Sequence, residues 1–161
     1  MILSDQNMRI EVTAVVDGEI IPIENVDDQI FSKKMIGDGY GIHPTSQTVY
    51  SPIDGRIEQV AQSKHAVYIA MDDEMKLLIH IGIDTIDLKG EGFTSELKKG
   101  APVKKGDPLI HFNPTFIKEE GLNPVICVVL LNGTKKKLHL TVHSSDKAKA
   151  NETIAMTIDE I

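Results

Sequence analysis

The sequence predicts an all-β fold: an antiparallel β-sandwich or barrel with a few short helical turns. Short runs rich in Ile, Val and Thr recur along the chain, as is typical of strands. Gly, Pro, Asp and Asn separate these runs at close intervals, which favours tight turns between neighbouring strands. With 161 residues, of which 41% are hydrophobic, we expect a single domain over residues 1–161 with one compact core.

The first strands follow from alternation and from Asp-Gly turns. EVTAVV (11–16) and EIIPI (19–23) lie on either side of one Asp-Gly pair, and GRIEQVA (55–61) begins at another. HAVYIAM (65–71) alternates regularly, whereas KLLIHIGI (76–83) is almost continuously apolar. Alternation predicts a strand with one polar face, and a continuous run predicts a strand buried on both faces.

The second half of the chain predicts three more strands. DPLIHF (107–112) and KLHLTVH (137–143) alternate, and NPVICVVLL (123–131) is a short apolar run that also predicts a strand. Helical periodicity is weak, so we expect only single turns of helix, at 28–34, 93–99 and 114–120.

Composition excludes several classes of protein. A net charge of −7 argues against a nucleic-acid ligand. No run approaches the roughly 20 apolar residues of a membrane span, and no signal peptide is expected, so no direct membrane insertion is predicted. The single cysteine, Cys127, excludes an internal disulfide and fits a reducing compartment, which predicts a cytoplasmic location. Residues 1–10 are expected to form a short, flexible lead.

The stretch KLLIHIGID carries a histidine in the middle of Leu and Ile residues. With the alternating run before it, this stretch predicts a β-hairpin that turns at Asp72–Asp73. Pairing outward from a two-residue turn places His65 directly opposite His80. Opposed Cβ atoms of antiparallel strands are about 4.5–5.5 Å apart, so the two rings are expected to meet.

The composition of the two faces supports this register. A shift by one residue would place His65 against Ile81 and mix the faces, which the alternation disfavours. In the favoured register one face is uniformly apolar and belongs in the core, while the other carries the two histidines. The core face holds Ala66, Tyr68 and Ala70 opposite Ile79, Leu77 and Met75; the other holds His65, Val67 and Ile69 opposite His80, Leu78 and Lys76.

The pattern by itself leaves the purpose of the two histidines open. A histidine on a strand is often structural, but an opposed pair can also bind zinc, act as acid and base, or carry a covalent group. A zinc site would need a third ligand, and the sequence offers no clear one. The other histidines are interpreted as structural or solvent-facing: His43, His111, His139 and His143.

Several motifs around the hairpin resemble the glucose-type IIA component of the bacterial phosphoenolpyruvate-dependent sugar phosphotransferase system. The most specific is HIGIDTIDLKGEGF (80–93), in which Ile86 stands where Val is usual. The resemblance covers about residues 11–112. Shorter matching motifs are Gly37-Asp38-Gly39, Pro44-Thr45, Ser51-Pro52-Ile53-Asp54-Gly55, Lys64-His65-Ala66 and Val103-Lys104-Lys105-Gly106-Asp107.

The resemblance implies a phosphocarrier that forms a phosphohistidine and needs no cofactor. It implies that His80 accepts a phosphoryl group on Nε2 from the histidine phosphocarrier protein HPr. The group then passes to the cysteine of a IIB domain, which phosphorylates sugar entering through a membrane IIC domain. His65 is implied to stay unphosphorylated and to assist onward transfer, with Ser63 orienting its ring.

The resemblance also implies a docking face around the two histidines. An apolar rim is expected to exclude water and seat the partner, and acidic residues beside it are expected to meet basic groups of HPr or IIB. The backbone carbonyl of Gly82 is expected to hold Nδ1–H of His80. The rim residues are Ile30, Phe31, Val67 and Leu78, and the acidic residues are Asp28 and Asp84.

Three positions depart from the usual pattern of the family. Ser63 stands where Thr is usual and keeps the hydroxyl, whereas Ala61 and Gln29 make the expected docking face less hydrophobic. An alternative function is a regulatory protein whose unphosphorylated His65/His80 face inhibits permeases or metabolic enzymes, with a partner carboxylate completing a zinc site. A zinc peptidase is disfavoured, because the chain has no H-x-H ligand pair.

Overall fold

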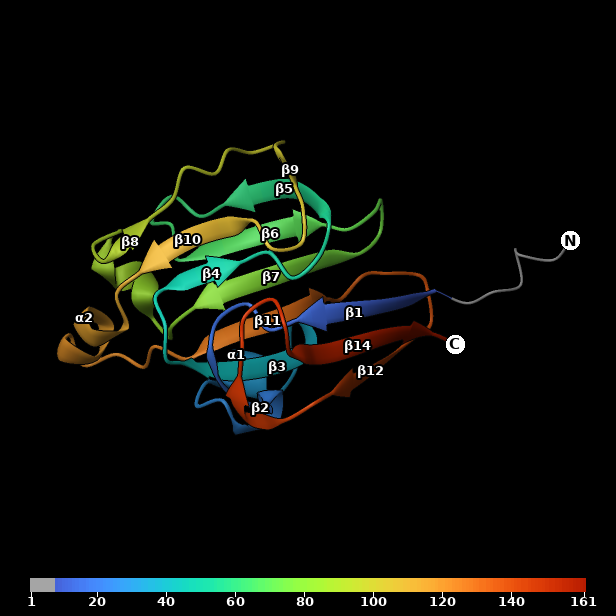
Figure 1. Cartoon of the computed structure of the whole chain (residues 1–161), viewed down its shortest axis with the longest axis horizontal. Helices are drawn as coiled ribbons and strands as arrows, with labels where there is room; N and C mark the ends of the chain where they lie inside the picture. The colour runs from blue at the N-terminus through green and yellow to red at the C-terminus, as the bar shows by residue number, and fades with distance from the viewer. Residues whose placement is uncertain (1–7) are drawn as a thin grey trace, which may run out of the picture.

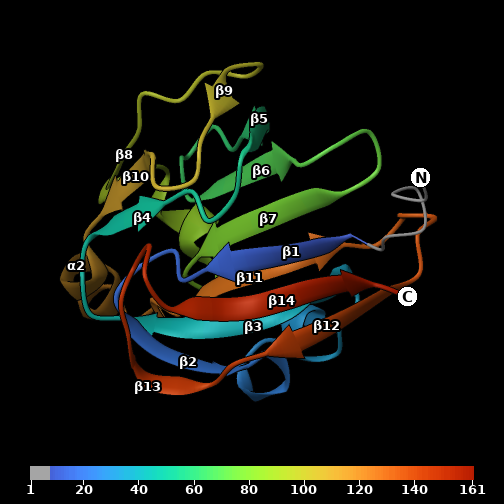
Figure 2. The same cartoon turned by 45° about the vertical axis from the view of Figure 1, so that its right-hand side comes forward.

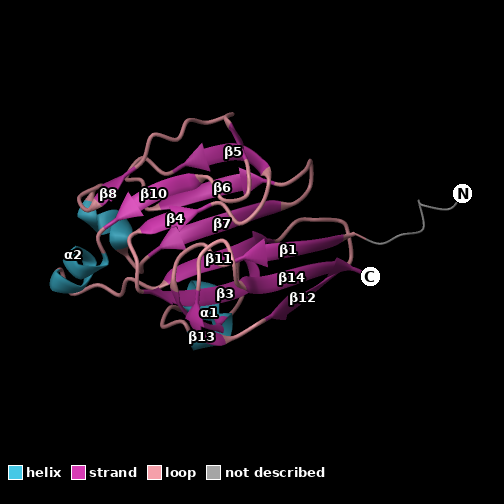
Figure 3. Cartoon of the chain, in the orientation of Figure 1, coloured by secondary structure: helices cyan, strands magenta, loops and turns pink. Residues whose placement is uncertain are grey.

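The computed structural model describes residues 8–161 and is built almost entirely of antiparallel strands (Figures 1 and 3). Its helices are short: α1 (Gln29–Ser32), α2 (Pro114–Glu119), and the 3-10 turns η2 (Ile23–Asn25) and η3 (Thr85–Leu88). The strands are β1 (Arg9–Thr13), β2 (Gly18–Pro22), β3 (Gly37–Pro44), β4 (Thr48–Tyr50), β5 (Gly55–Val60), β6 (Ala66–Ala70), β7 (Lys76–Ile81), β8 (Phe93–Thr94), β9 (Pro102–Val103), β10 (Pro108–Phe112), β11 (Ile126–Leu131), β12 (Leu138–Val142), β13 (Ser145–Ala148) and β14 (Ile154–Glu160).

The strands form one large sheet and two small ones. The large sheet has the order β13-β2-β3-β11-β7-β6-β5-β9, and the small sheets have the orders β1-β14-β12 and β4-β10-β8. In Figures 1 and 2 the small sheets lie along one side of the large sheet. Buried side chains from all three sheets form the main core, among them Val12, Ile42, Ile79, Ile110 and Met156. The predicted all-β sandwich is therefore confirmed.

A second, smaller apolar cluster lies on the opposite face of the large sheet. It covers the central strands β7 and β11, which explains why both strands have nearly continuous apolar sequences. The region of η2 and α1 packs over this face through Ile23, Val26 and Phe31. The remaining buried members are Ala66, Leu78, Val125, Cys127 and Val129.

All eight predicted strands are present, each shifted by no more than a few residues. Two of the predicted helical turns are also present, as α1 and α2. Each begins at a side-chain cap: Asp28 accepts a hydrogen bond from the Ile30 N–H, and Asn113 accepts one from the Phe116 N–H. The turn expected at 93–99 is wrong, because Phe93 and Thr94 form β8 against β10 and an extended segment follows.

The predicted lead over residues 1–10 is partly wrong. Residues 1–7 lie outside the described part of the chain. Arg9 and Ile10 belong to β1, where they pair with Asp159 and Ile158 of β14. Strand β14, whose sequence IAMTIDE alternates, was not predicted. Pairing with β14 makes Arg9 and Ile10 part of a strand, so the lead was predicted too long.

We expect the main core to carry most of the folding free energy. Ile42 is fully buried on β3, whereas Ile86 is 60% exposed. Ile42→Ala is expected to lower the free energy of unfolding by about 2–5 kcal/mol, because it removes buried methyl groups and leaves a cavity. Ile86→Ala deletes the same atoms and is expected to change it by less than about 0.5 kcal/mol. Urea unfolding of both variants measures the difference, and equal losses would contradict this placement of the core.

Candidate functional site

The β6–β7 hairpin is present, but its predicted register is wrong by one residue. Ala66, not His65, lies opposite His80, and the loop between the strands has three residues instead of two. The Met71 N–H donates to the Met75 carbonyl over 2.8 Å, which closes this loop. Within the loop, the Asp72 carboxylate accepts hydrogen bonds from the backbone N–H groups of Glu74 and Met75. This side-chain cap stabilises the longer loop and so sets the register.

The two imidazole rings nevertheless meet. Strand β6 begins at Ala66, and Lys64 has a left-handed φ of 61°, so the chain bends just before His65. The His65 carbonyl accepts a hydrogen bond of 2.7 Å from the Ile81 N–H. The ring centroids of His65 and His80 lie 5.0 Å apart with an interplanar angle of 82°. The bend, and not direct strand pairing, therefore brings the histidines together.

His80 sits on the second apolar cluster. Its ring centroid lies 5.2 Å from that of Phe31, at a tilt of 56°. Across the sheet it is paired with Cys127 of β11, and Leu78 precedes it on the same face of β7. Phe31, Leu78 and Cys127 are all at least 95% buried, so the base of the histidine site is dry. His80 itself is half-buried, and its Nδ1 is buried.

The predicted apolar rim needs a correction. Val67 is completely buried in the main core on the other side of the sheet, because the register shift turns it away from His80. Phe31 and Leu78 contact the cluster beneath the ring and are 5% and 2% exposed, so they form the base of the site and not its surface. Ile30 alone lies where a rim residue was expected, with 48% exposure.

Two exposed apolar residues were not identified from the sequence. Ile86, on η3, is 60% exposed, and Met35, after α1, is 62% exposed. Ile86 also lines a hollow of about 380 Å³ beside the histidines, together with Ala61, Gln62, Ser63, His65 and Lys89. An apolar residue on a one-turn helix has no periodic signal, so its exposure could not be predicted from the sequence.

Burial keeps both rings neutral. Desolvation lowers the pKa of His80, and the neighbouring His65 lowers it further, while the backbone of Gly82 and the charge of Asp28 oppose the shift; the resulting pKa is about 4. Desolvation also lowers the pKa of His65. Burial raises the pKa of the Cys127 thiol to about 12. At neutral pH the site therefore presents two uncharged imidazoles above a protonated thiol.

Hydrogen bonds orient one ring more firmly than the other. Ser63 Oγ lies 2.7 Å from His65 Nδ1, which is the contact expected of Ser63, and it leaves Nε2 of His65 unengaged. Nδ1 of His80 is buried and has no hydrogen-bond partner of standard geometry among residues 8–161. Gly82 affects the pKa of this ring, but the expected bond from Nδ1–H to its carbonyl stays a prediction.

Left-handed residues shape the loop that follows His80. Gly82 has φ 78°, and a Cβ there would lie 2.3 Å from Thr85 Cγ2, so only glycine fits. Asp84 also has a left-handed φ of 59° and is exposed at the start of η3. Asp28 is half-buried at the cap of α1. Both predicted acidic residues thus lie at the ends of elements that flank the histidines.

No cluster of three His, Cys, Asp or Glu side chains suited to a metal ion is found in residues 8–161. A zinc site shared with a partner carboxylate stays a prediction. Within the same residues, no helix has the length and apolar character needed to cross a membrane.

The electrostatics can be tested by titrating the ring resonances of His80 by NMR. We expect a pKa near 4 in the native protein. His65→Gln removes a repelling charge and should raise the pKa of His80, although burial should keep it below the ordinary value. Asp28→Asn removes a favourable charge and should lower it further. A shift in the same direction in both variants would contradict this account of the site.

Comparison with known proteins agrees with the geometry. Residues 10–136 match the family model described as phosphoenolpyruvate-dependent sugar phosphotransferase system, EIIA 1. A glucose-specific EIIA component of the phosphotransferase system from Oceanobacillus iheyensis is 42% identical over 123 residues, which are 76% of this chain and 74% of the relative. A component of the same name from Staphylococcus aureus is 38% identical over 144 residues, which are 89% of this chain and 86% of the relative.

A solved structure extends the similarity to the fold. The glucose permease IIA from Mycoplasma capricolum superposes with a TM-score of 0.83 at 30% identity, over 93% of this chain and 96% of that one. A family model that spans most of the chain, two relatives and a solved structure thus agree. The chain therefore belongs to the EIIA 1 family of the phosphoenolpyruvate-dependent sugar phosphotransferase system and has that family's phosphocarrier role in sugar uptake.

Proposed function

We propose that His80 carries the phosphoryl group, accepting it from HPr and passing it to the cysteine of a IIB domain in the cytoplasm. The observation that carries this proposal is the pair of neutral rings, 5.0 Å apart, on a dry apolar base. A neutral imidazole has a free lone pair on one nitrogen, which makes it a nucleophile at physiological pH. With a pKa near 4, His80 keeps that lone pair at neutral pH.

The transfer exchanges one N–P bond for another and needs no further covalent step on the protein. As the N–P bond of the donor phosphohistidine breaks, the lone pair of His80 Nε2 forms a new N–P bond, and Nδ1 keeps its proton. The transition state is loose, so positioning and charge stabilisation dominate. Phe31 and Leu78 support the His80 ring from below and exclude water that would otherwise hydrolyse the product.

His65 is proposed to steady the transferring group and not to carry it. Its contact with Ser63 uses Nδ1, so Nε2 is the nitrogen left to donate a hydrogen bond to phosphoryl oxygens. That bond strengthens as negative charge collects on the oxygens in the transition state. The lowered pKa of His65 means that the ring donates as a neutral N–H, so the phosphohistidine is not trapped in a tight ion pair.

The surface around the histidines supports docking of a basic partner. Exposed Ile30 and Ile86 supply apolar contact area, and the carboxylates of Asp28 and Asp84 lie at the starts of the same two helical turns. A net charge of −7 adds a long-range field that attracts positively charged surfaces and speeds encounter. HPr and the IIB domain are the partners proposed for this face.

The phosphorylated residue is identified by incubation with phosphoenolpyruvate, enzyme I and HPr, followed by mapping of acid-labile, alkali-stable phosphate. We expect one phosphate per chain, on His80. His80→Ala should lose it completely, because no other nucleophile occupies that position. Stoichiometric label in the His80→Ala variant would refute the assignment. His139→Ala, which changes an exposed strand residue, is the matched control and should keep full labelling.

His65→Gln separates the two roles. We expect His80 still to accept phosphate, whereas transfer to the IIB cysteine should slow by a factor of about 100 or more, the usual contribution of one transition-state donor. Single-turnover quench measurements of both half-reactions provide the numbers. Lost acceptance with intact donation would reverse the roles assigned to the two histidines.

A further inference from the structure

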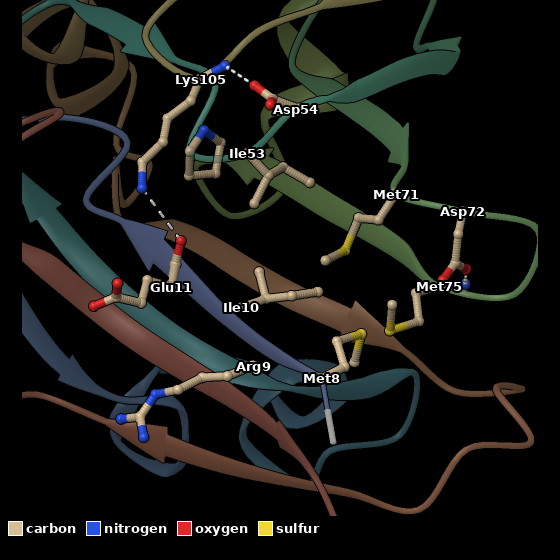
Figure 4. A pocket seen from close by; sticks show the side chains of 11 residues that line it. Met8, Arg9, Ile10, Glu11, Ile53, Asp54, Met71, Asp72, Met75 and Lys105 are labelled. Carbon is tan, nitrogen blue, oxygen red and sulfur yellow. Dashed lines mark hydrogen bonds between the residues drawn. The ribbon is translucent and has the colours of Figure 1, made fainter. Parts of the chain in front are cut away.

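A large hollow lies apart from the histidines. It has a volume of about 550 Å³ and opens between β1, the loop before β5, the tip of the β6–β7 hairpin and the turn at Lys105 (Figure 4). Met75 lines it, on the main-core side of β7. His80 is five residues further along the strand, about 16 Å away, and faces the other side of the sheet. The site already described does not account for this hollow.

One wall of the hollow is a free strand edge. Strand β1 is the outer strand of its sheet. The Glu160 N–H donates to the Met8 carbonyl over 2.9 Å, so Met8 turns its backbone toward β14. Backbone groups alternate in direction along an antiparallel strand, and Arg9 and Glu11 therefore turn theirs away from β14. Lys105 Nζ reaches the Glu11 carbonyl at 3.5 Å, which shows that this edge faces the hollow (Figure 4).

The floor of the hollow is apolar and adaptable. Figure 4 shows Met8, Ile10, Ile53, Met71 and Met75 converging on the space beside β1. Ile53 and Met75 are nearly fully buried, and the other three pack against the main core while remaining partly exposed. Methionine side chains are unbranched and polarisable, so they adjust to apolar groups of different shape. The hollow can thus receive an apolar side chain from a strand placed alongside β1.

The charged side chains along the β1 edge differ in whether they are paired. Arg9 points to Asp159 of the neighbouring strand at 3.6 Å, so its charge is compensated within the sheet. Glu11 is exposed and forms no ion pair among residues 8–161. Asp54 adds a second carboxylate, which accepts a hydrogen bond from the backbone N–H of Lys105. A cationic side chain opposite Glu11 would complement this edge, because opposite charges on paired strands attract.

We propose that the β1 edge and its hollow form a docking site for an extended segment of a partner protein in which basic and apolar residues alternate. The segment pairs antiparallel with β1 and exchanges hydrogen bonds with the backbone of Arg9 and Glu11, where it displaces the long 3.5 Å contact of Lys105 Nζ with the Glu11 carbonyl. Its apolar side chains enter the hollow beside Ile10, and its basic side chains lie opposite Glu11. The site is separate from the phosphoryl site and does not depend on its assignment.

A synthetic peptide of alternating Lys and Val, acetylated and amidated, tests the proposal against the full chain. The Lys residues pair with Arg9 and Glu11, so N-methylation of their amides should weaken binding about tenfold, because each methyl group removes a donor to β1. N-methylation of the Val amides, which point away from β1, should change binding less than about twofold. Equal effects of the two modifications would overturn the proposal.

Variants of Glu11 test the same edge from the protein's side. Glu11→Pro removes the N–H that points away from β14 and also removes the negative charge. Because the backbone N–H of Glu11 is not bonded to β14, the substitution leaves the hydrogen bonds between β1 and β14 intact. We expect it to weaken peptide binding about tenfold, while Glu11→Gln, which keeps the N–H, retains most of the binding. Unchanged phosphate acceptance would show that both variants are folded. Full binding by Glu11→Pro would refute strand pairing.

Hydrogen exchange identifies what covers the edge. In the free chain the amides of Arg9 and Glu11 should exchange rapidly, and the peptide should protect them. Protection in the free chain at every concentration would mean that the chain covers its own edge, and protection that grows with dimer formation would mean that a second copy does. Either result would overturn the proposal of a partner segment.

Discussion

The pairing of β7 with β11 at the centre of the large sheet is the constraint on which the rest of the structure depends. Ile126 to Leu130 pair with Ile81 to Leu77 without a break, and both faces of this ladder are buried. One face packs on the two small sheets, and the other packs under the region of η2 and α1. His80 lies in this ladder opposite Cys127, so a side chain that prefers water is held at the margin of an apolar cluster.

The chemistry of the site follows from that position. Desolvation and the neighbouring His65 both disfavour the charged form of His80, and they outweigh the favourable effects of Gly82 and Asp28. A neutral ring is the reactive form for a group that must accept and then release phosphate. In the proposed mechanism, the same burial that makes the strand stable therefore prepares His80 as the nucleophile, and no additional catalytic group is needed to deprotonate it.

Much of the fold was predictable because strand periodicity is a local property. The run NPVICVVLL indicated a strand, and β11 lies within it; the run HAVYIAM indicated β6. The short strands β4, β8 and β9 were missed because two or three residues carry no period, and β3 was missed because its glycines hide the alternation. The register of the hairpin was predicted wrongly because the alternation was given too much weight: β6 is apolar on both faces, so the hydrophobic pattern does not separate the two registers.

The sequence by itself determined the fold class and five strands of the large sheet, namely β2, β5, β6, β7 and β11, and it singled out the two histidines proposed for the site, since these depend on the period of the chain and on residue type. The tertiary structure alone decided how the histidines meet. A three-residue loop capped by Asp72 moves Val67 into the main core, and the bend at Lys64 returns the His65 ring to His80. Loop length and backbone φ are set by hydrogen bonds and packing between distant segments, which hydrophobic alternation does not encode.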